Sequence, residues 1–286
     1  MFVDAHVHLQ PHGEKPPVTR ALIESYVERA QRNGVDVVVF TEHLFRFKEA
    51  LAVLDGWWNC DPNPALRKLA EQYWLDHVNL SLPEYVSLIE QAKSDGLPVR
   101  LGLEMDWIPD HAEDLRAILK PYGWDCVLGS VHFLGAFGID VEEYLDEWQR
   151  RDLSSVWEEY TQLIEDLADS RLANTLAHPD VIKVWGFRPD DEAKYQRRIV
   201  EAARRNGTAL EVNTNGWRKP VNEMYPAPAL LRLARETGVP ITLGSDAHTP
   251  DRLGQRFDEA VANARAAGYG EYLTFVSGKP VAVALP

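Results

Sequence analysis

The feature that most constrains the fold is a regular alternation of short apolar runs with longer amphipathic stretches. Seven runs rich in valine, isoleucine and leucine are separated by segments whose apolar residues recur with helical spacing. This alternation is typical of a mostly parallel sheet that helices cover on its outside. Strands are predicted at residues 2–5, 35–40, 99–103, 125–129, 173–177, 208–213 and 240–243, and helices at residues 19–33, 82–95, 112–120, 141–170, 189–206, 227–237 and 255–267.

Seven strand–helix units in a chain of 286 residues favour a closed barrel over a small open sheet. We predict a TIM-like α/β barrel that forms one domain over residues 1–286. An open, doubly wound sheet is the alternative. The chain lacks the G-x-G-x-x-G motif after its first strand that would favour such a sheet.

Residues 44–80 do not follow the alternation. The segment is long, rich in aromatic residues and interrupted by prolines. Long insertions after barrel strands commonly lie over the active face. We predict short helices in this segment, which form either a lid over that face or an additional packed layer.

Composition argues against several classes of protein. The formal net charge is −14, so the basic surface that binds a nucleic acid backbone is not expected. No apolar run reaches the ~18 residues of a membrane span, and the amino terminus does not resemble a secretory signal. Two cysteines, Cys60 and Cys126, are too few for a disulfide scaffold. We expect a cytoplasmic monomer or homodimer that binds neither nucleic acid nor membrane.

Histidines are concentrated where the predicted strands end. Of nine histidines, seven lie at or just after the carboxyl end of a predicted strand, and Glu104 and Asp246 lie at equivalent places. The carboxyl ends of parallel barrel strands form one face, so these side chains are expected to converge. His6 and His8 are two residues apart, which places both side chains on the same side of a strand.

Divalent metal ions are the natural partners of such a cluster, because buried polar groups without partners are costly. Nine ligands exceed one tetrahedral site and predict two or three ions, with Glu104 as the bridging carboxylate. Mixed nitrogen and oxygen ligands suit zinc, manganese or iron, between which the sequence does not choose. The candidate ligands are His6, His8, His12, His43, Glu104, His132, His178, Asp246 and His248.

Seven motifs resemble those of the PHP (polymerase and histidinol phosphatase) family, and in particular its histidinol-phosphatase branch. They are DAHVHLQPHG, VVVFTEH, GLEMD, LGSVHFLG, LAHPD, EVNTNGWRKP and GSDAHTP, and the resemblance spans residues 4 to about 285. It implies a distorted (β/α)7 barrel with a trinuclear metal site, whose ligands match all nine candidates by motif. The chain departs from the family pattern in its short loop at His12 and in Glu42, where many relatives carry aspartate.

The resemblance implies a phosphoric monoester hydrolase. The expected reaction converts L-histidinol phosphate to L-histidinol and phosphate, a step of histidine biosynthesis, by attack of a metal-bound hydroxide. The candidates for protonating the leaving alcohol are a water molecule, Asp246 and His248. Candidates for contacting this small phosphorylated substrate are Arg218, Lys219, Lys183 and Asn213.

Other functions remain open at this point. A different small phosphoester is compatible with the same site. Exonuclease-like relatives act on nucleic acid, but the acidic charge argues against a nucleotide or oligonucleotide substrate. An amidohydrolase that cleaves C–N bonds also begins with H-x-H, yet it typically bridges its ions through a lysine, where this chain offers Glu104 and His132. A metal-binding scaffold without catalysis would be expected to have lost ligands that this chain retains.

Overall fold

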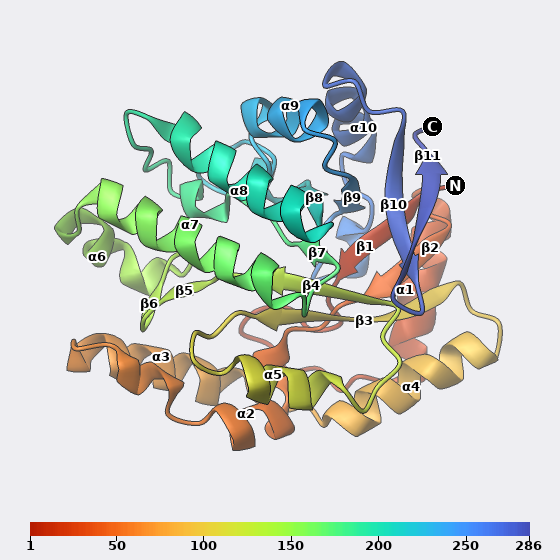
Figure 1. Cartoon of the computed structure of the whole chain (residues 1–286). Helices are drawn as coiled ribbons and strands as arrows, with labels where there is room; N and C mark the ends of the chain where they lie inside the picture. Colours follow the sequence, from red (N-terminus) through yellow and green to blue (C-terminus); the bar gives the residue numbers. More distant parts are fainter.

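Seven parallel strands form the central sheet of the computed structural model, which describes residues 1–286 (Figure 1). The strands neighbour one another in the order β1-β2-β3-β4-β7-β8-β9, so each pairs with the next sheet strand along the chain. Every one overlaps a predicted apolar run. The strands are β1 (Val3–Val7), β2 (Val37–Phe40), β3 (Val99–Asp106), β4 (Cys126–Ser130), β7 (Thr175–Leu176), β8 (Ala209–Asn213) and β9 (Ile241–Gly244).

The sheet curls until its first and last strands meet. Val7 and Ala247 form a parallel bridge, and the backbone N–H of His8 donates to the carbonyl oxygen of Ala247 at 2.8 Å. Because this one bridge joins the two edges, the barrel is nearly closed and distorted. The predicted α/β barrel is confirmed, and the carboxyl ends of all seven strands share one rim.

Helices pack around the outside of the sheet, each with an apolar stripe turned inward (Figure 1). In α7, for example, Trp157, Tyr160, Ile164 and Leu167 recur at helical spacing and are buried. No helix combines the length and the apolar character that a membrane span requires. The seven outer helices are α1 (Arg20–Arg32), α4 (Leu82–Ser94), α5 (Ala112–Leu119), α7 (Leu153–Ser170), α8 (Glu192–Asn206), α9 (Pro228–Glu236) and α10 (Phe257–Ala266).

One predicted helix is divided in the structure. The sequence predicted a single helix over residues 141–170, whereas the chain forms η3 (Glu142–Tyr144), α6 (Leu145–Arg150) and then α7. The Asp152 carboxylate accepts a hydrogen bond from the backbone N–H of Ser155 at 2.8 Å and so caps the start of α7. Asp is a strong N-cap residue, and this local bond competes with a continuous helix.

The segment at residues 44–80 forms a helical layer beside the barrel. Its longest helix has 14 residues and exceeds the short helices predicted there. Trp57 packs against Trp74 and Phe133, with ring centroids 5.6 and 5.0 Å apart, and so attaches the layer to the β5–β6 hairpin. A lid function stays a prediction. The elements are η1 (Leu44–Arg46), α2 (Lys48–Leu54), η2 (Trp57–Cys60), α3 (Pro64–His77), β5 (Phe133–Leu134) and β6 (Phe137–Gly138).

A carboxyl-terminal hairpin, which the sequence analysis did not anticipate, covers the amino-terminal end of the barrel (Figure 1). It pairs β10 (Glu271–Val276) with β11 (Lys279–Ala284), and its two turn residues, Ser277 and Gly278, both have positive φ. Such a turn suits the twist of a two-residue hairpin. The Tyr272 hydroxyl accepts the N–H of Val3 at 3.0 Å, so this hairpin closes the end of the barrel opposite the metal-ligand rim.

Asp125 links the hairpin turn to the barrel, and its side chain is fully buried. Its carboxylate accepts from Lys93 Nζ at 2.7 Å and from the N–H groups of Leu101 and Ser277 at 3.1 and 2.7 Å. We expect Asp125→Ala to lower the free energy of unfolding by about 2–4 kcal/mol, because these donors lose their acceptor. Urea denaturation measures the change.

The matched control is Glu113→Ala, since that side chain is 86% exposed on α5. Its effect is expected to stay below about 0.5 kcal/mol. Coincident denaturation midpoints for wild type and Asp125→Ala would show that the link contributes nothing to stability.

Candidate functional site

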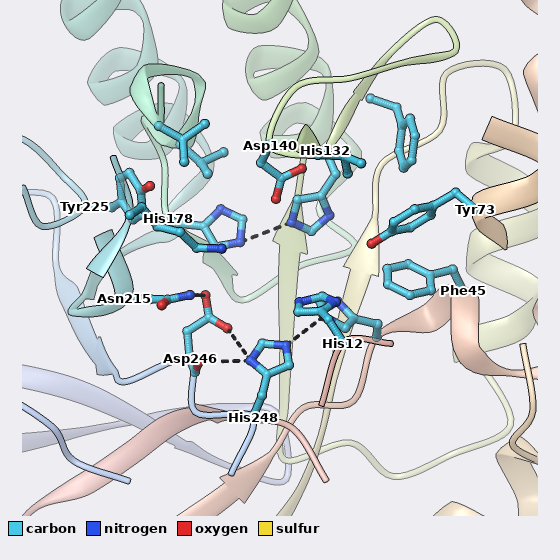
Figure 2. A pocket seen from close by; sticks show the side chains of 16 residues that line it. His12, Phe45, Tyr73, His132, Asp140, His178, Asn215, Tyr225, Asp246 and His248 are labelled. Carbon is cyan, nitrogen blue, oxygen red and sulfur yellow. Dashed lines mark hydrogen bonds and ion pairs between the residues drawn. The ribbon is translucent and has the colours of Figure 1, made fainter. Parts of the chain in front are cut away.

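A small cavity of about 40 Å³ lies at the carboxyl ends of the strands (Figure 2). It opens into an outer cavity of about 560 Å³. Six of the nine predicted metal ligands line the inner cavity, namely His12, His43, His132, His178, Asp246 and His248. Five residues border both cavities, namely His12, Tyr73, Asp140, Val141 and Lys219.

The strands hold eight of the predicted ligands on one rim, and none of the eight is more than 8% exposed. Two residues near the rim, His178 and Asp246, have positive φ values of 26° and 52°. Non-glycine residues adopt this backbone rarely, and here it turns the chain directly after a strand. The eight ligands belong to or follow β1 (His6, His8), β2 (His43), β3 (Glu104), β4 (His132), β7 (His178) and β9 (Asp246, His248).

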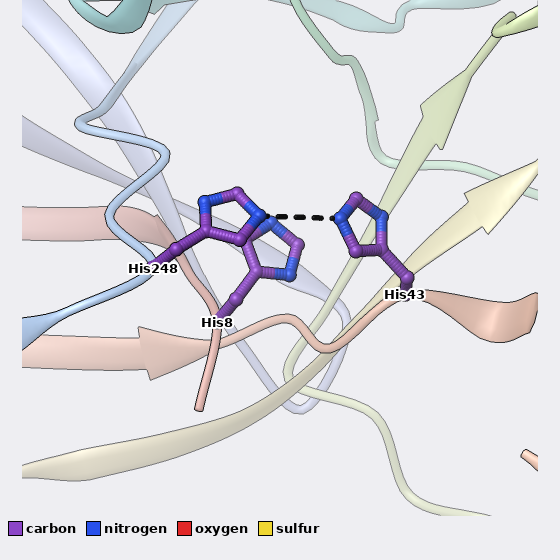
Figure 3. Close-up of side chains that lie close together, drawn as sticks. All are labelled: His8, His43 and His248. Carbon is purple, nitrogen blue, oxygen red and sulfur yellow. Dashed lines mark hydrogen bonds between the residues drawn. The ribbon is translucent and has the colours of Figure 1, made fainter. Parts of the chain in front are cut away.

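Three imidazoles form the first group that can hold a metal ion (Figure 3). The rings of His43 and His248 both stack on His8, with centroids 4.0 and 4.2 Å away, and their own centroids lie 5.6 Å apart. His43 Nε2 lies 3.4 Å from His248 Nε2. The ninth predicted ligand, His12, packs beside them with its ring centroid 4.3 Å from that of His248.

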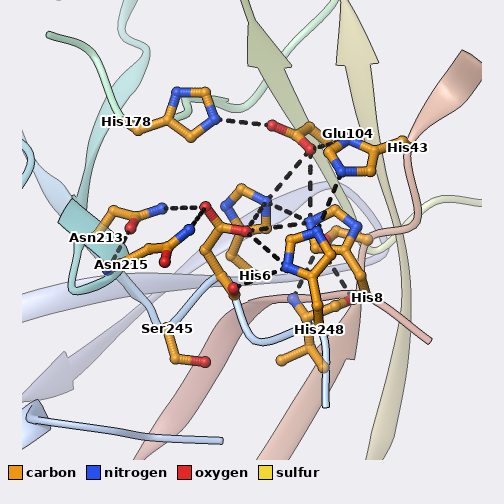
Figure 4. Close-up of polar contacts among 12 residues, drawn as sticks. His6, His8, His43, Glu104, His178, Asn213, Asn215, Ser245 and His248 are labelled. Atoms are coloured by element: carbon orange, nitrogen blue, oxygen red, sulfur yellow. Dashed lines mark hydrogen bonds and ion pairs between the residues drawn. The ribbon is translucent and has the colours of Figure 1, made fainter. Parts of the chain in front are cut away.

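Glu104 forms the third group with His132 and His178, and the second group is His6, His8 and Asp246. Figure 4 shows the Glu104 carboxylate beside His43 and His178 and facing His6 and His8. Its Oε1 is 2.9 Å from His178 Nε2, and its Oε2 is 2.6 Å from His43 Nδ1. The same Oε2 is 3.5 Å from His6 Nε2. One carboxylate thus reaches members of all three groups, which is the placement that a bridging ligand requires.

Several ligand atoms have no satisfactory partner within the protein. The Nδ1 of His178 is buried and makes no hydrogen bond, and the 2.6 Å approach of His43 Nδ1 to Glu104 Oε2 lacks the geometry of one. His6 Nε2 also faces His8 Nε2 at 3.0 Å, where at most one of two facing nitrogens can donate to the other. Divalent cations accept lone pairs from imidazole nitrogen and carboxylate oxygen and would satisfy these atoms. The residues therefore fit divalent metal ions.

The electrostatic environment favours the forms that bind cations. Burial lowers the pKa of His43 and of His248 well below the usual value, and the neighbouring His8 lowers both further, so the two rings are neutral at pH 7. Burial opposes ionisation of Glu104, but His43 and His6 lower its pKa well below the usual value. Burial also opposes protonation of His6, yet nearby carboxylates raise its pKa well above the usual value. A cation that binds there displaces a proton.

Two carboxylates orient the ligands from behind, and the sequence analysis did not name them. Glu211 in β8 lies 2.8 Å from His6 Nδ1 and accepts the N–H of His178 at 2.7 Å. Asp106 in β3 lies 2.7 Å from His132 Nδ1. Carboxylates behind metal-binding histidines commonly fix the ring orientation. Both occur at the carboxyl ends of predicted strands, and this shared position was a signal that could have identified them.

Glu42 and Asn215 give similar support on the other sides of the site. Glu42 lies 3.4 Å from His8 Nδ1 and pairs with the fully buried Arg46, whose Nε is 3.1 Å away. Asn215 donates from Nδ2 to Asp246 Oδ2 at 2.9 Å. The Glu42 carboxylate therefore supports the ligand His8 from behind, at the position where many relatives of the family carry aspartate.

Gly244 leaves room for this arrangement. A Cβ atom at this position would lie 2.0 Å from Glu211 Oε1 and 2.7 Å from the Cβ of His6. Neither neighbour is the free end of a flexible surface chain, because both residues are fully buried. Only glycine lets β8, β9 and β1 bring Glu211 and His6 together.

The four residues predicted to contact substrate have different surroundings. Lys219 borders both cavities. Arg218 donates to Asn215 Oδ1 at 2.7 Å, and Asn213 donates to Glu211 Oε2 at 3.1 Å, so both lie next to the ligand layer. Lys183 does not line the inner cavity, and its fully buried ammonium group lies within 3.0 Å of three acceptors. All four contacts with substrate stay predictions.

Comparisons with known proteins agree with this geometry. The model of the PHP domain family matches residues 8–215. A probable histidinol-phosphatase of Deinococcus radiodurans is 36% identical over 275 residues, which cover 95% of each chain. The histidinol-phosphatase of Bacillus subtilis is 26% identical, with 89% of this chain and 96% of that protein covered.

Solved structures share the fold. The histidinol phosphate phosphatase of Lactococcus lactis, solved with zinc, L-histidinol and phosphate, superposes with a TM-score of 0.73 over 98% of each chain, at 22% identity. A putative histidinol phosphatase of Listeria monocytogenes gives a TM-score of 0.72, with 90% of this chain and 99% of that chain covered, at 21% identity. At these identities, the likeness supports the barrel architecture alone.

Replacing Glu211 with glutamine tests the layer behind the ligands. We expect Glu211→Gln to weaken metal binding by about 10- to 100-fold, because the neutral amide orients His6 and holds His178 less firmly. Competition with a chromogenic zinc chelator measures the affinity. Glu201→Gln, on the exposed surface of α8, is the control and should bind zinc like the wild type. An unchanged affinity in Glu211→Gln would remove this residue from the support of the site.

Proposed function

The chain belongs to the PHP domain family, and from this premise we propose that it is a metal-dependent histidinol-phosphatase. This phosphoric monoester hydrolase converts L-histidinol phosphate to L-histidinol and phosphate. The observation that carries the proposal is the convergence of three buried ligand groups at one cavity, with Glu104 between them. A relative that is 36% identical over 95% of each chain is named a probable histidinol-phosphatase, which supports the substrate.

The ligand groups account for two or three divalent ions of zinc, manganese or iron. The site residues are the nine candidates His6, His8, His12, His43, Glu104, His132, His178, Asp246 and His248. When bound, the ions would activate a water molecule and neutralise charge on the phosphoryl group. The chain itself keeps their ligands buried and orients them through the layer of acids behind.

The remaining chemical tasks fall to residues around the cavity. Lys219 is the one predicted substrate contact that borders both cavities, and its ammonium group suits a phosphoryl oxygen. The leaving alcohol must take up a proton as its bond to phosphorus breaks. A water molecule, Asp246 or His248 would deliver this proton, since both residues line the inner cavity and the His248 Nδ1 lies 3.5 Å from Asp246 Oδ1.

The outer cavity matches the alcohol part of this substrate. Asp76, Asp140, Glu142 and Glu143 line it, and none of the four forms an ion pair within the protein. Lys219 is the only lysine or arginine among the lining residues. Carboxylates at this entrance repel a phosphate group and attract a cation, so the lining favours a substrate whose remaining part is cationic. Histidinol carries an ammonium group and an imidazole, and it meets this condition.

The same acidic lining disfavours an oligonucleotide, because further phosphates would face further carboxylates. Glu104 in the central position also differs from the lysine bridge that an amidohydrolase would use. A phosphatase for a cationic amino alcohol is therefore the function that this site supports best.

The direct experiment measures phosphate release from a panel of phosphomonoesters. The purified protein is stripped of metal with a chelator and reloaded with zinc, manganese or iron(II) one at a time. We expect histidinol phosphate to have the highest kcat/KM, and the stripped protein to be inactive until it is reloaded. Faster turnover of an anionic sugar phosphate, or full activity after chelation, would contradict the proposed function.

Asp140→Asn tests the role of the acidic outer cavity. We expect KM for histidinol phosphate to rise about 10-fold, since one charge-assisted contact with the substrate cation is lost. Turnover of p-nitrophenyl phosphate, whose leaving group is not cationic, should stay within about twofold of wild type. Asp146→Asn, with a side chain 83% exposed on α6, is the matched control. Equal losses for both substrates would assign Asp140 to the chemistry and not to substrate selection.

A further inference from the structure

Tyr225 brings a buried hydroxyl group without a partner to the inner cavity. Its residue is only 1% exposed, and its Oη makes no hydrogen bond within the protein. Figure 2 places Tyr225 on the same wall of the cavity as His178 and Asn215. A buried hydroxyl without a partner costs about 1–3 kcal/mol. Such a group calls for an explanation at a site whose ligand is not a protein atom.

The backbone fixes the position of this tyrosine. Asn213, the last residue of β8, exchanges two hydrogen bonds with Tyr225, with N···O distances of 2.6 and 3.0 Å. Gly216 provides room for the ring, since a Cβ atom there would lie 2.9 Å from Tyr225 Cε2. The same Cβ atom would lie 2.1 Å from the carbonyl oxygen of Glu223. A residue larger than glycine at Gly216 in η5 (Asn215–Arg218) would therefore collide with the tyrosine ring.

A buried ion network holds the other side of the ring. Lys183 Nζ lies 5.3 Å from the ring centroid and donates to the carbonyl oxygen of Met224 at 2.8 Å. Asp180 pairs with Lys183 at 2.8 Å and accepts the N–H of Ala227 at 2.7 Å. These bonds flank Tyr225 along the chain, yet none reaches its hydroxyl group. The network therefore fixes the ring and leaves the Oη available to a bound molecule.

We propose that the Tyr225 hydroxyl donates a hydrogen bond to a non-bridging phosphoryl oxygen of the substrate. The inference rests on the proposed phosphatase function. On this wall the amide of Asn215 already donates to Asp246, and the other phenol of the inner cavity, Tyr73, lies on the opposite wall (Figure 2). A phenol has an ordinary pKa of about 10, so it carries its proton at neutral pH and acts as a donor. Tyr225 thus complements Lys219, which borders the cavity where it joins the outer cavity.

Tyr225→Phe removes the hydroxyl and keeps the ring that packs on Gly216 and Lys183. Inorganic phosphate is the binding probe, titrated calorimetrically into the metal-loaded protein. We expect its Kd to rise about 10-fold and kcat/KM for p-nitrophenyl phosphate to fall about 10- to 100-fold. Tm and metal content should not fall, because the hydroxyl has no partner in the protein. This combination of weaker binding and undiminished stability is the signature of a substrate contact.

Tyr195→Phe is the control, since its hydroxyl donates to the carbonyl oxygen of Ser154 between α8 and α7, away from the site. It should leave phosphate binding unchanged. Unchanged phosphate binding and turnover in Tyr225→Phe, or a loss of activity together with Tm and metal content, would overturn the inference. A wild-type protein that binds no phosphate would overturn it as well.

Failure of the proposed substrate gives a different result. In that case wild type hydrolyses p-nitrophenyl phosphate but not histidinol phosphate, and the effect of Tyr225→Phe on phosphate binding still decides the role of the hydroxyl.

Discussion

The candidate site is organised around buried lone pairs that suit divalent metal ions. Glu104 is fully buried, with its two oxygens within 2.9 Å of His178 and His43. Imidazole nitrogens also face one another at close range, since His6 Nε2 lies 3.0 Å from His8 Nε2. In an interior of low dielectric constant, such a cluster is costly without a balancing charge. Bound cations would remove this free-energy cost, and the removal would contribute to the affinity of the site for metal.

The barrel makes this cluster rigid by adding a second layer behind it. Glu211 serves two ligands from different strands, because it contacts the ring of His6 and the backbone of His178. The missing side chain of Gly244 lets β1, β8 and β9 approach closely enough for this contact. His6 and Glu104 lie within strands and the other ligands on this rim closely follow strand ends, so strand packing fixes where the ligands meet, as a preorganised metal site requires.

Charge changes sign from the ligand layer to the entrance. The ligand groups at the inner cavity suit cations, and bound cations would attract a phosphate group. Acids that form no ion pair, such as Asp140, line the outer cavity. A substrate with an anionic and a cationic end can satisfy both regions at once. Under the proposed function, this arrangement would link the acids near the entrance to substrate choice, because they would face the leaving group.

The barrel and its ligand-bearing rim can be predicted from patterns in the sequence. Seven apolar runs with helices between them predict parallel strands, and histidines at the strand ends predict convergence, since these patterns repeat locally along the chain. The sequence also contains a turn signal for the β10–β11 hairpin at Ser277 and Gly278. The strand–helix alternation that predicts the barrel does not include this hairpin. The division of the helix at Asp152 depended on one capping bond that periodicity does not reveal.

Which side chains contact one another depends on how the elements pack. Glu211 contacts His6 across 205 residues of sequence, and no local pattern specifies that pairing. The buried network around Lys183 and the hydroxyl of Tyr225 likewise depend on distances between separate loops. Periodicity reports which side of a strand or helix a residue occupies, whereas a cavity and its unpartnered atoms arise from how those elements pack against one another.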